Sequence, residues 1–557
     1  MIKRYSFILS MLLVVTFVTN SQVPPPPPLG PGEYYTDLYS RSYDYQTNGS
    51  IRYLVQDPSD PKNLCAILMS QKDSSDPIGT NRYIYFSYTT DGGKTWTEAV
   101  VNNSTNHGFP CMTVRNGTVV IACHRTGATG TFVYEDLLFG GFTFSLLGTF
   151  PTNPSAVIWP HIGSADNGNV TVAAAPNPGF QGHWSTYTTS WSSPLVQLTN
   201  TGGPSGNFGM HGKGTNIAII GSDYNGNDEV RLWTSNNSGT SFTLETGSNA
   251  PPLFMENPFA GDTLFGYIVG GKQVYYDGSG NLHAVYAVYG SSAVGLSSPP
   301  NTAWYKKTSK IVHWSAATGV DTIASYWKVP NLADTITTAL MNPVCQPTLG
   351  HFNGLLYCTF TAFLIGNVQT VQNGAIVNAG EIMISWSADG GDTWSPPVNL
   401  TNTPNIEEKH SSFVPDFVLP TSNDSLGVYY IRDMLAGGWV NVAAWGKAPV
   451  YGIYKKIGGP IGINGNSQVA GEFRLFQNYP NPFNPSTTIS YYLPKSSVVT
   501  LKVYDVVGKE VATLVNEYQT SGAKEVVFNA SGMASGIYYY SISADNFRGT
   551  KKMILIK

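Results

Sequence analysis

Charged side chains are scarce in this chain of 557 residues: Asp, Glu, Lys and Arg together make up only 12%, where about 25% is usual. The net charge at pH 7 is -4, so the sequence lacks the basic balance that binding to nucleic acid or to an anionic membrane requires. Glycine, proline and tyrosine are abundant instead, with 58, 36 and 33 residues. This composition argues against a mainly helical protein and favours a β-rich extracellular protein with many turns.

Long apolar runs are also missing, apart from one near the N-terminus. Residues 7–18 are apolar but too few to cross a bilayer, and they follow Lys3 and Arg4. A basic start, a short apolar run and small residues after it are typical of a signal peptide, which we assign to residues 1–21. The proline-rich residues 22–44 are then expected to form a spacer, and the mature chain to be exported without a transmembrane span.

Cysteine is rare, with five residues, and export would permit disulfides. Two pairs, Cys111 with Cys123 and Cys345 with Cys358, each bracket an Asn-Gly turn. An ideal two-residue turn puts Cys111 opposite Ala122 instead of Cys123, so a bridge there needs a bulge. The sequence therefore leaves two alternatives open: bridged pairs, or small buried apolar residues on strands.

Internal repeats are the most informative feature of residues 45–455. A turn followed by a short apolar strand recurs seven times, and a looser strand-turn-strand unit follows each copy. Two turns per repeat imply four strands, and four-stranded sheets repeated around an axis form a β-propeller. We therefore predict an all-β chain with a seven-bladed propeller, or a six-bladed one if one unit is misread. The copies are DPKNLCAIL (60–68), RNGTVVIAC (115–123), DNGNVTVAA (166–174), GKGTNIAII (212–220), GSGNLHAVY (278–286), FNGLLYCTF (352–360) and SNDSLGVYY (422–430).

Three of the looser units share an octet of the form S/T-x-D-x-G-x-T-W. Residues 89–96 (TTDGGKTW) and 387–394 (SADGGDTW) match in full, and residues 235–242 (SNNSGTSF) match with Asn and Phe substituted. The octet resembles the Asp-box, or bacterial neuraminidase repeat, of sialidase-type propellers. In those families it lies on the face away from the active site.

We expect each octet to form a turn in which the Asp or Asn accepts backbone N–H groups and glycine takes a left-handed backbone, while the aromatic ring packs between blades. These structural positions are Asp91, Gly93, Trp96, Asn237, Gly239, Phe242, Asp389, Gly391 and Trp394.

The composition changes after the repeats. Residues 456–471 are rich in glycine and are expected to form a linker. Residues 472–557 then contain NYPNPFNPSTTI, VYDVVGKEV, SGIYYY and TKKMILIK in this order. This segment closely resembles the C-terminal sorting domain of proteins exported by type IX secretion. The resemblance implies a small β-sandwich that the secretion machinery recognises at the outer membrane, and a protein that is secreted or attached to the cell surface.

Ligand sites in a propeller are expected around the central channel, on the face opposite the first hairpin turns. Sequence order places charged, histidine and aromatic side chains there, a mixture that suits a sugar or a carboxylated glycan. The histidines lack the spacing of metal ligands and no cofactor motif is present, so we expect neither a metal nor a cofactor. The residues predicted to bind a ligand are His107, Trp159, His161, His211, Glu408, His410 and Asp433.

The resemblance to sialidases implies an arginine triad, an acid/base aspartate and a tyrosine–glutamate pair. Residues 50–54 (SIRYL) occupy the place of the family's arginine motif but lack its Phe/Tyr and Ile-Pro neighbours. We therefore expect foremost a propeller that binds glycans or other extracellular polymers. The alternatives are a sialidase-like glycoside hydrolase and a non-catalytic structural or adhesive propeller. The residues that fit the hydrolase roles are Arg52, Asp73, Asp76, Arg125, Arg432 and Tyr430.

Overall fold

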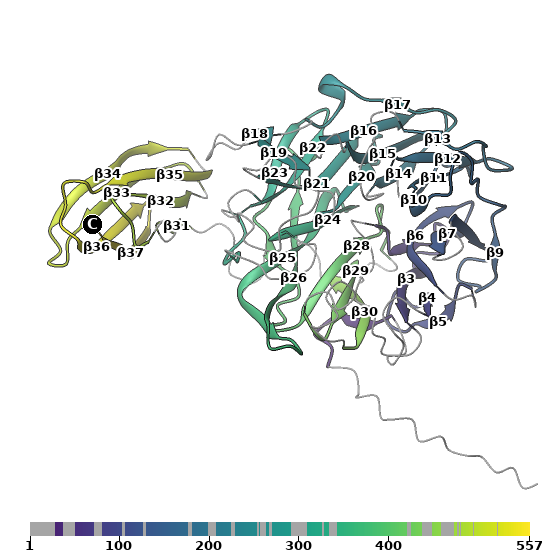
Figure 1. The fold of residues 1–557 in the computed structure, drawn as a ribbon, viewed down its shortest axis with the longest axis horizontal. Coiled ribbons are helices and arrows are strands. Elements are labelled where there is room, and N and C mark those ends of the chain that lie inside the picture. The colour runs from purple at the N-terminus through teal and green to yellow at the C-terminus, as the bar shows by residue number, and fades with distance from the viewer. Residues whose placement is uncertain are drawn as a thin grey trace, which may run out of the picture.

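The protein is described by a computed structural model. It is all-β: every regular element in the described residues is a β-strand except one short 3-10 turn, Gly247–Asn249. The strands form a ring of sheets, followed by a small sandwich of two sheets (Figure 1). The described residues are 28–36, 51–71, 81–102, 106–125, 130–176, 181–198, 208–223, 229–252, 255–256, 263–266, 270–290, 309–325, 328–333, 342–419, 425–436, 448–457, 473–475, 478, 481–493, 495–520 and 522–556.

Seven antiparallel sheets follow one another between Glu33 and Ile457, and we number them 1 to 7 along the chain. Sheet 1 contains β2 (Leu54–Gln56), β3 (Leu64–Gln71), β4 (Arg82–Thr89) and β5 (Thr97–Val100). Sheet 2 contains β6 (His107–Arg115), β7 (Thr118–Arg125), β8 (Gly130–Asp136) and β9 (Phe144–Leu146). Sheet 3 contains β10 (Ile158–Ser164), β11 (Val170–Ala175), β12 (His183–Tyr187) and β13 (Val196–Gln197). Sheet 4 contains β14 (Gly209–Lys213), β15 (Asn216–Asp223), β16 (Glu229–Ser235) and β17 (Thr243–Leu244).

The last three sheets carry additions to this four-stranded plan. Sheet 5 has six strands: β18 (Met255–Glu256), β19 (Thr263–Gly266), β20 (Lys272–Tyr276), β21 (Leu282–Gly290), β22 (Lys310–Ser315) and β23 (Gly319–Ser325). Sheet 6 has a long central hairpin and contains β24 (Val344–Phe352), β25 (Leu355–Thr370), β26 (Ile376–Ser387) and β27 (Val398–Asn399). Sheet 7 contains β28 (Glu407–Phe413), β29 (Leu426–Asp433), β30 (Val450–Ile457) and the N-terminal β1 (Glu33–Tyr35).

The sheets form a closed ring around a central axis, which is the architecture of a β-propeller. Their innermost strands contact one another in the cyclic order β2, β6, β10, β14, β20, β24, β28 and back to β2. Each of the seven sequence repeats leads into the strand beside the innermost one. The largest buried apolar cluster joins side chains of sheets 1, 2, 3, 6 and 7.

The N-terminal segment completes the last sheet. Strand β1 pairs with β30 in antiparallel register, with Glu33 opposite Lys455 and Tyr35 opposite Ile453. The three residues of β1 lie within residues 22–44, which the sequence analysis above predicted to be a spacer. Sheet 7 is therefore built from both ends of the propeller chain, and the pairing of β1 with β30 holds the ring closed.

The first hairpin of sheet 2 shows how local sequence sets the register. Asn116 and Gly117 both have positive φ angles, of 49° and 79°, as a two-residue hairpin turn requires. Cys111 consequently lies opposite Ala122, and Cys123 falls outside the register of a bridge. All five cysteines are buried and none forms a disulfide, so they pack as small apolar residues.

The three octets form the outer turns of sheets 1, 4 and 6, and we call residues 89–96, 235–242 and 387–394 the box turns. In the first, Asp91 accepts hydrogen bonds from the backbone N–H groups of Lys94 and Thr95 at 2.9 and 3.0 Å. The indole N–H of Trp96 donates to the carbonyl of Gly93 at 3.0 Å, which fixes the ring. Asp389 and Trp394 repeat this pattern in the third box turn.

Each box turn also packs against the preceding sheet. Trp96 of sheet 1 lies 5.6 Å, ring to ring, from Tyr454 of sheet 7. A Cβ added to Gly93, which has a φ of +90°, would lie 2.2 Å from the Tyr454 ring. Glycine is therefore required there for two reasons, the left-handed backbone and the lack of space.

The C-terminal residues form a separate sandwich with its own apolar core. One sheet contains β31 (Arg474–Leu475), β32 (Ser486–Leu493) and β35 (Gly522–Asn529). The other contains β33 (Ser497–Tyr504), β34 (Glu510–Gln519), β36 (Gly536–Ala544) and β37 (Phe547–Leu555). Along β33, Val499, Leu501 and Val503 are buried while Val498 is exposed, as the alternating pattern predicts. The turn at 505–508 joins β33 to β34 in a hairpin.

Replacing Gly93 with alanine tests whether box-turn packing stabilises the ring. Gly117→Ala is the matched control, because Gly117 also has a positive φ but an added Cβ there meets nothing within 4 Å. We expect Gly117→Ala to cost about 1 kcal/mol from backbone strain alone, and Gly93→Ala about 2–4 kcal/mol because the Tyr454 ring must also move. Urea unfolding measures both; equal losses would show that the contact with Tyr454 contributes nothing.

Candidate functional site

Four innermost strands contain the same irregularity. The register of β6, β10, β24 and β28 shifts by a bulge. At each bulge one residue other than glycine has a left-handed backbone, namely Phe109, Trp159, Gln346 and His410, with φ between 52° and 56°. Such residues are uncommon and tend to occur at functional sites. The bulges therefore mark one level of the central channel, toward the start of each inner strand.

Proline explains three of the four bulges. Pro110, Pro160 and Pro347 each follow the left-handed residue directly. A proline has no N–H to give to the neighbouring strand, so a ladder that reaches it must break or bulge. An X-Pro pair inside an inner strand is therefore the sequence signal that could have located these bulges.

The bulges of sheets 2 and 3 bring aromatic rings together. The Phe109 ring stacks on the imidazole of His124 at 4.8 Å, and the Trp159 ring meets the same imidazole edge-on at 6.4 Å. The backbone N–H of Trp159 donates to His124 Nδ1 at 3.2 Å. Phe109 and Trp159 are both partly exposed. We call these three residues the aromatic platform.

The aromatic platform is electrically neutral. Burial, together with the nearby charge of Arg82, lowers the pKa of His124 to about 3. His124 therefore carries no charge at neutral pH, and the rings present an apolar surface with the edge of a neutral imidazole. Such a surface suits the C–H face of a sugar ring better than an anion.

Polar groups without partners lie on the inner strands of sheets 1 and 7. The imidazole of His410 is 2% exposed, and neither of its nitrogens has a hydrogen-bond partner in the structure. The hydroxyl of Ser411 and the Nε of Arg52 are likewise buried without a partner. The ring of His410 lies 6.2 Å from that of Tyr53, which follows Arg52 in the chain. Buried polar atoms are nearly always satisfied, so these atoms call for water or a ligand.

Arg52 is electrostatically coupled to groups on other inner strands. Its burial lowers the pKa of the guanidinium to about 10, whereas Asp416 raises it, and the group stays charged at neutral pH. The charge of Arg52 in turn adds to burial in lowering the pKa of His211 on sheet 4. Since sheets 1 and 4 are not neighbours, Arg52 acts across the channel.

The opposite end of the channel is covered by the chain segment 414–419. Asp416 accepts hydrogen bonds from Lys213 of sheet 4 at 2.7 Å and from the hydroxyl of Tyr275 of sheet 5. The backbone of Val418 bonds twice to the side chain of Gln56 of sheet 1. These partners lie where the inner strands run into their first hairpins, so this segment spans the channel on the hairpin face.

Sheet 7 holds an ionic network on one of its faces. The Arg432 guanidinium is 1% exposed and donates to Glu33 at 2.9 Å and to Glu408 at 2.8 Å. The Tyr430 hydroxyl donates to Glu33 at 2.7 Å, and Lys455 donates to the same carboxylate at 3.0 Å. This network crosses all four strands and joins β1 to the innermost β28.

The two carboxylates that share Arg432 differ in pKa. Burial raises the pKa of Glu33, but Arg432, Gly30, Tyr430 and Lys455 together outweigh burial and lower it to about 2. Burial raises the pKa of Glu408 to about 7, against the lowering effect of Arg432 and two threonine hydroxyls. Glu33 has more donors, so it holds the negative charge and Glu408 is the carboxylate that is poised to take up a proton.

The opposite face of sheet 7 holds a second ion cluster. Lys409 Nζ lies 2.6 Å from Glu407 and 3.5 Å from Asp433, and all three side chains are buried. Asp433, predicted to bind a ligand, therefore sits in an internal ion pair. The last sheet is fixed by charge on both of its faces.

The structure groups the predicted residues unevenly. Arg52, Arg125 and Arg432 stand on three different sheets, and Arg432 is already bound to two carboxylates. Asp73 and Asp76 lie outside the described residues. His107 contacts Tyr134 and Phe132, and His161 contacts Phe208. Trp159 joins the aromatic platform, while Tyr430 and Glu408 join the ionic network.

Some residues of the region were not foreseen. Glu33 lay in the expected spacer, and Phe109 and Gln346 carry no charge that would draw attention. In the described part of the chain, no three His, Cys, Asp or Glu side chains are grouped as metal ligands would be.

Comparison with known proteins identifies the C-terminal segment. Residues 477–557 match the family described as the secretion system C-terminal sorting domain. The protein is therefore exported by type IX secretion and is either secreted or held at the outer-membrane surface. No curated protein matches the chain. In the described residues no helix has the length and hydropathy needed to cross a membrane.

Solved structures with similar folds are distant. The polysaccharide lyase Uly1 is 11% identical, with a TM-score of 0.41 over 76% of this chain and 94% of the lyase. A Trypanosoma rangeli sialidase with bound sialic acid is 9% identical, with a TM-score of 0.39 over 94% of this chain and 88% of the sialidase. An endo-1,4-beta-xylanase from Bacteroides thetaiotaomicron is 13% identical, with a TM-score of 0.30 over 51% of this chain and 97% of the xylanase. Similarity at this level carries no argument about activity.

The opposite pKa shifts of Glu408 and Glu33 give a testable pH dependence. Glu408 has a raised pKa in the folded protein, so its protonation stabilises the fold below about pH 4.5 and this stabilisation is lost as the pH rises through 7. Relative to Glu408→Gln, the free energy of unfolding of the wild type should fall by up to about 3 kcal/mol as the pH rises from 4.5 through 7. Glu33 has a lowered pKa, so relative to Glu33→Gln the wild type should instead lose stability as the pH falls from 4.5 toward 2.

Urea unfolding at several pH values, with each variant compared with the wild type, measures these two slopes. Slopes of the same sign for both variants would contradict the assignment of the charge to Glu33.

Proposed function

We propose that this exported protein binds a glycan or a similar extracellular polymer at the mouth of its central channel. The observation that carries the proposal is the set of buried polar groups without partners, Arg52 Nε, the His410 imidazole and the Ser411 hydroxyl. A bound sugar offers both hydroxyl donors and acceptors, so it would bond to the partly exposed Arg52 and, through water, to the buried groups behind it. Arg52 would also read a carboxylate on the ligand.

The aromatic platform supports the same proposal. Phe109 and Trp159 are partly exposed beside a neutral His124, and apolar rings with a few convergent polar groups are typical of ligand sites. Segment 414–419 covers the hairpin face of the channel, so a ligand would enter from the other face. In this proposal the partly exposed Arg52 contacts the ligand directly, and the buried His410, His211 and Glu408 support it from behind.

We further propose that the three box turns are the Asp-boxes of the sialidase-type families, serving structure and not chemistry. The accompanying division of the chain is a signal peptide at 1–21, an N-terminal segment at 22–44 that contributes β1, a propeller at 45–455, a linker at 456–471 and the sorting domain at 472–557.

A sialidase-like hydrolase is the second candidate. One observation favours it: Tyr430 donates to a glutamate at 2.7 Å beside Arg432, which is the kind of pairing that the resemblance implies. However, Tyr430 and Arg432 are buried, and Arg432 is neutralised by Glu33 and Glu408. A substrate carboxylate would have to displace one of these partners, so we place binding ahead of hydrolysis. Release of the fluorophore from a fluorogenic sialoside, lost in Arg432→Ala, would reverse this order.

The binding site is tested with the secreted protein on an array of neutral and carboxylated glycans, followed by calorimetry of the best ligand. We expect Trp159→Ala to weaken binding about ten-fold or more, because hot-spot aromatic residues contribute at least this much. Arg52→Met should weaken binding of carboxylated glycans similarly, and Arg548→Met on the exposed surface of the sorting domain should have no effect. Unchanged affinity in both channel variants, or no glycan bound at all, would refute the proposed site.

Removal of residues 472–557 tests the route of delivery. The truncated protein should accumulate in the periplasm, because the sorting domain that the secretion machinery recognises is gone. Immunoblots of periplasmic, outer-membrane and medium fractions measure the distribution, with the full chain as control. Normal appearance of the truncated protein in the medium would contradict a role for this domain in export.

A further inference from the structure

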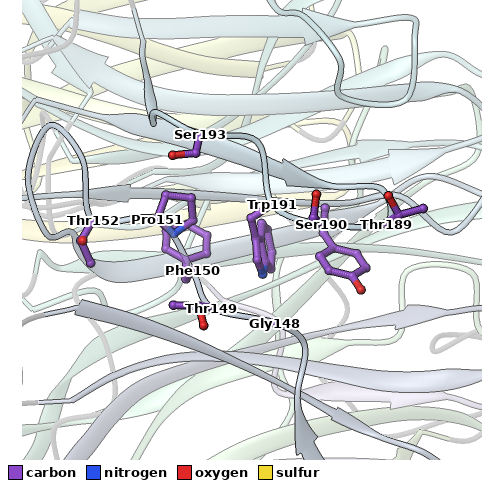
Figure 2. Close-up of a pocket in the computed structure, with 10 residues that line it drawn as sticks. Gly148, Thr149, Phe150, Pro151, Thr152, Thr189, Ser190, Trp191 and Ser193 are labelled. Carbon is purple, nitrogen blue, oxygen red and sulfur yellow. The ribbon is translucent and has the colours of Figure 1, made fainter.

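A pocket lies at the outer edge of the ring between sheets 2 and 3. Figure 2 shows the residues that line it. One side is the link that follows β9, residues 148–152, and the other is the turn from β12 to β13, residues 187–193. Its volume is about 330 Å³, within the range of small-molecule sites. It is remote from the channel mouth, because β9 and β13 are outermost strands of their sheets.

The pocket occupies a place that box turns fill elsewhere. In sheets 1 and 6 a glycine of the turn comes so close to the preceding sheet that an added Cβ would lie 2.2 Å from Tyr454 and 2.1 Å from His313. Sheet 2 has an equivalent turn, in which Asp136 accepts hydrogen bonds from Thr143 and an added Cβ at Gly140 would lie 2.3 Å from Tyr88 of sheet 1. In these sheets the turn itself closes the space between neighbours.

Sheet 3 lacks such a turn. Its sequence there is TTSWSSP (188–194), with no aspartate, asparagine or glycine. Trp191 comes early in the turn and pairs with Tyr187 in an isolated antiparallel bridge. The indole N–H donates to the carbonyl of Leu147 at 2.6 Å, which holds the ring against sheet 2. Without the glycine wedge, the space between the turn and the link stays open.

Three aromatic rings form one wall of the pocket. The Trp191 ring lies 4.8 Å from that of Phe150 and 5.4 Å from that of Tyr187, tilted against each. The guanidinium of Arg115 lies 5.3 Å from the centre of the Tyr187 ring and supports it. The row is therefore rigid before any ligand binds, which reduces the entropy lost on binding.

The remaining lining is hydroxyl-rich and uncharged. Thr149, Ser190 and Ser193 are exposed at the pocket, and their hydroxyls appear around the ring row in Figure 2. No Asp, Glu, Lys or Arg is among the residues that line it. Hydroxyls can both donate and accept, so they match the hydroxyls of a sugar, whereas an ionic ligand would find no partner.

We propose that this pocket is a second binding site, specific for a neutral sugar unit of an oligosaccharide or polysaccharide. The partly exposed Tyr187 ring would contact the apolar face of the pyranose ring, with the buried Trp191 holding Tyr187 in place, and the threonine and serine hydroxyls would bond to the edge of the sugar. The site is independent of the channel mouth and works whether or not that site binds. Two sites on one protein raise the affinity for a long polymer by avidity, even when each site alone is weak.

The test uses the secreted full-length protein and a panel of neutral hexasaccharides, namely cello-, laminari-, manno-, malto- and xylohexaose, in calorimetric titrations. Ser190→Trp should fill the pocket and reduce affinity for the bound sugar at least ten-fold without lowering Tm, because Ser190 is exposed. Thr240→Trp is the matched control, an exposed hydroxyl residue in the box turn of sheet 4, and it should bind normally. Tyr187→Ala should reproduce the loss by removing a ring.

Trp159→Ala separates the two sites. It should leave binding at the pocket unchanged, and Ser190→Trp should leave binding at the channel mouth unchanged. Failure of every hexasaccharide to bind the wild type would overturn the proposal, as would wild-type affinity in Ser190→Trp. A loss that appears only in Trp159→Ala would assign the sugar to the channel mouth and also overturn the proposal.

Discussion

The structure depends on the closure of its ring at sheet 7. In a propeller each sheet contacts only its two neighbours, so the fold is complete only when the last sheet meets the first. Here β1 pairs with β30, and Glu33 of β1 reaches across the sheet to Arg432, whose other carboxylate partner is Glu408 on the innermost strand. Forming a buried ion pair costs desolvation energy. Removing one partner strongly destabilises the fold, because the other charge is left buried without a counter-charge. The same network thus makes the association of β1 specific, while burial in the sheet leaves Glu408 with a raised pKa.

The bulges on the inner strands break the regular pairing of the sheets at one level of the channel. Sheet pairing favours regular inner strands, yet four of them break register at a left-handed residue, and three of these precede a proline. Left-handed residues other than glycine are costly and persist only where their surroundings hold them. In sheets 2 and 3 this strain places Phe109 and Trp159 on His124, and in sheet 7 it places His410 in the interior without a hydrogen-bond partner. This geometry supports the ligand site that we propose at the channel mouth.

Local sequence patterns predicted the strands, the turns and the sorting domain, because each depends on a few neighbouring residues. The opposition of Cys111 and Ala122 follows from the Asn116-Gly117 turn alone. The site was less predictable, since its residues meet across long stretches of chain. Arg432 and Glu33 are 399 positions apart, and nothing near either one indicates the other. Arg432 was therefore interpreted as a group that faces a ligand, whereas the structure shows it bound to two carboxylates.

The pocket between sheets 2 and 3 lies beside a repeat whose outer turn departs from the box pattern. A repeat that matches its family pattern fills the space beside its neighbour with a glycine wedge and a fixed indole, as at Gly93 and Trp96. A repeat that departs from the pattern leaves the space and keeps the indole, as at Trp191. Because the other sheets maintain the ring, one turn can lose its packing role at little cost to the fold. Sheet 3, whose turn has lost the glycine wedge, can thus acquire a binding function at that place.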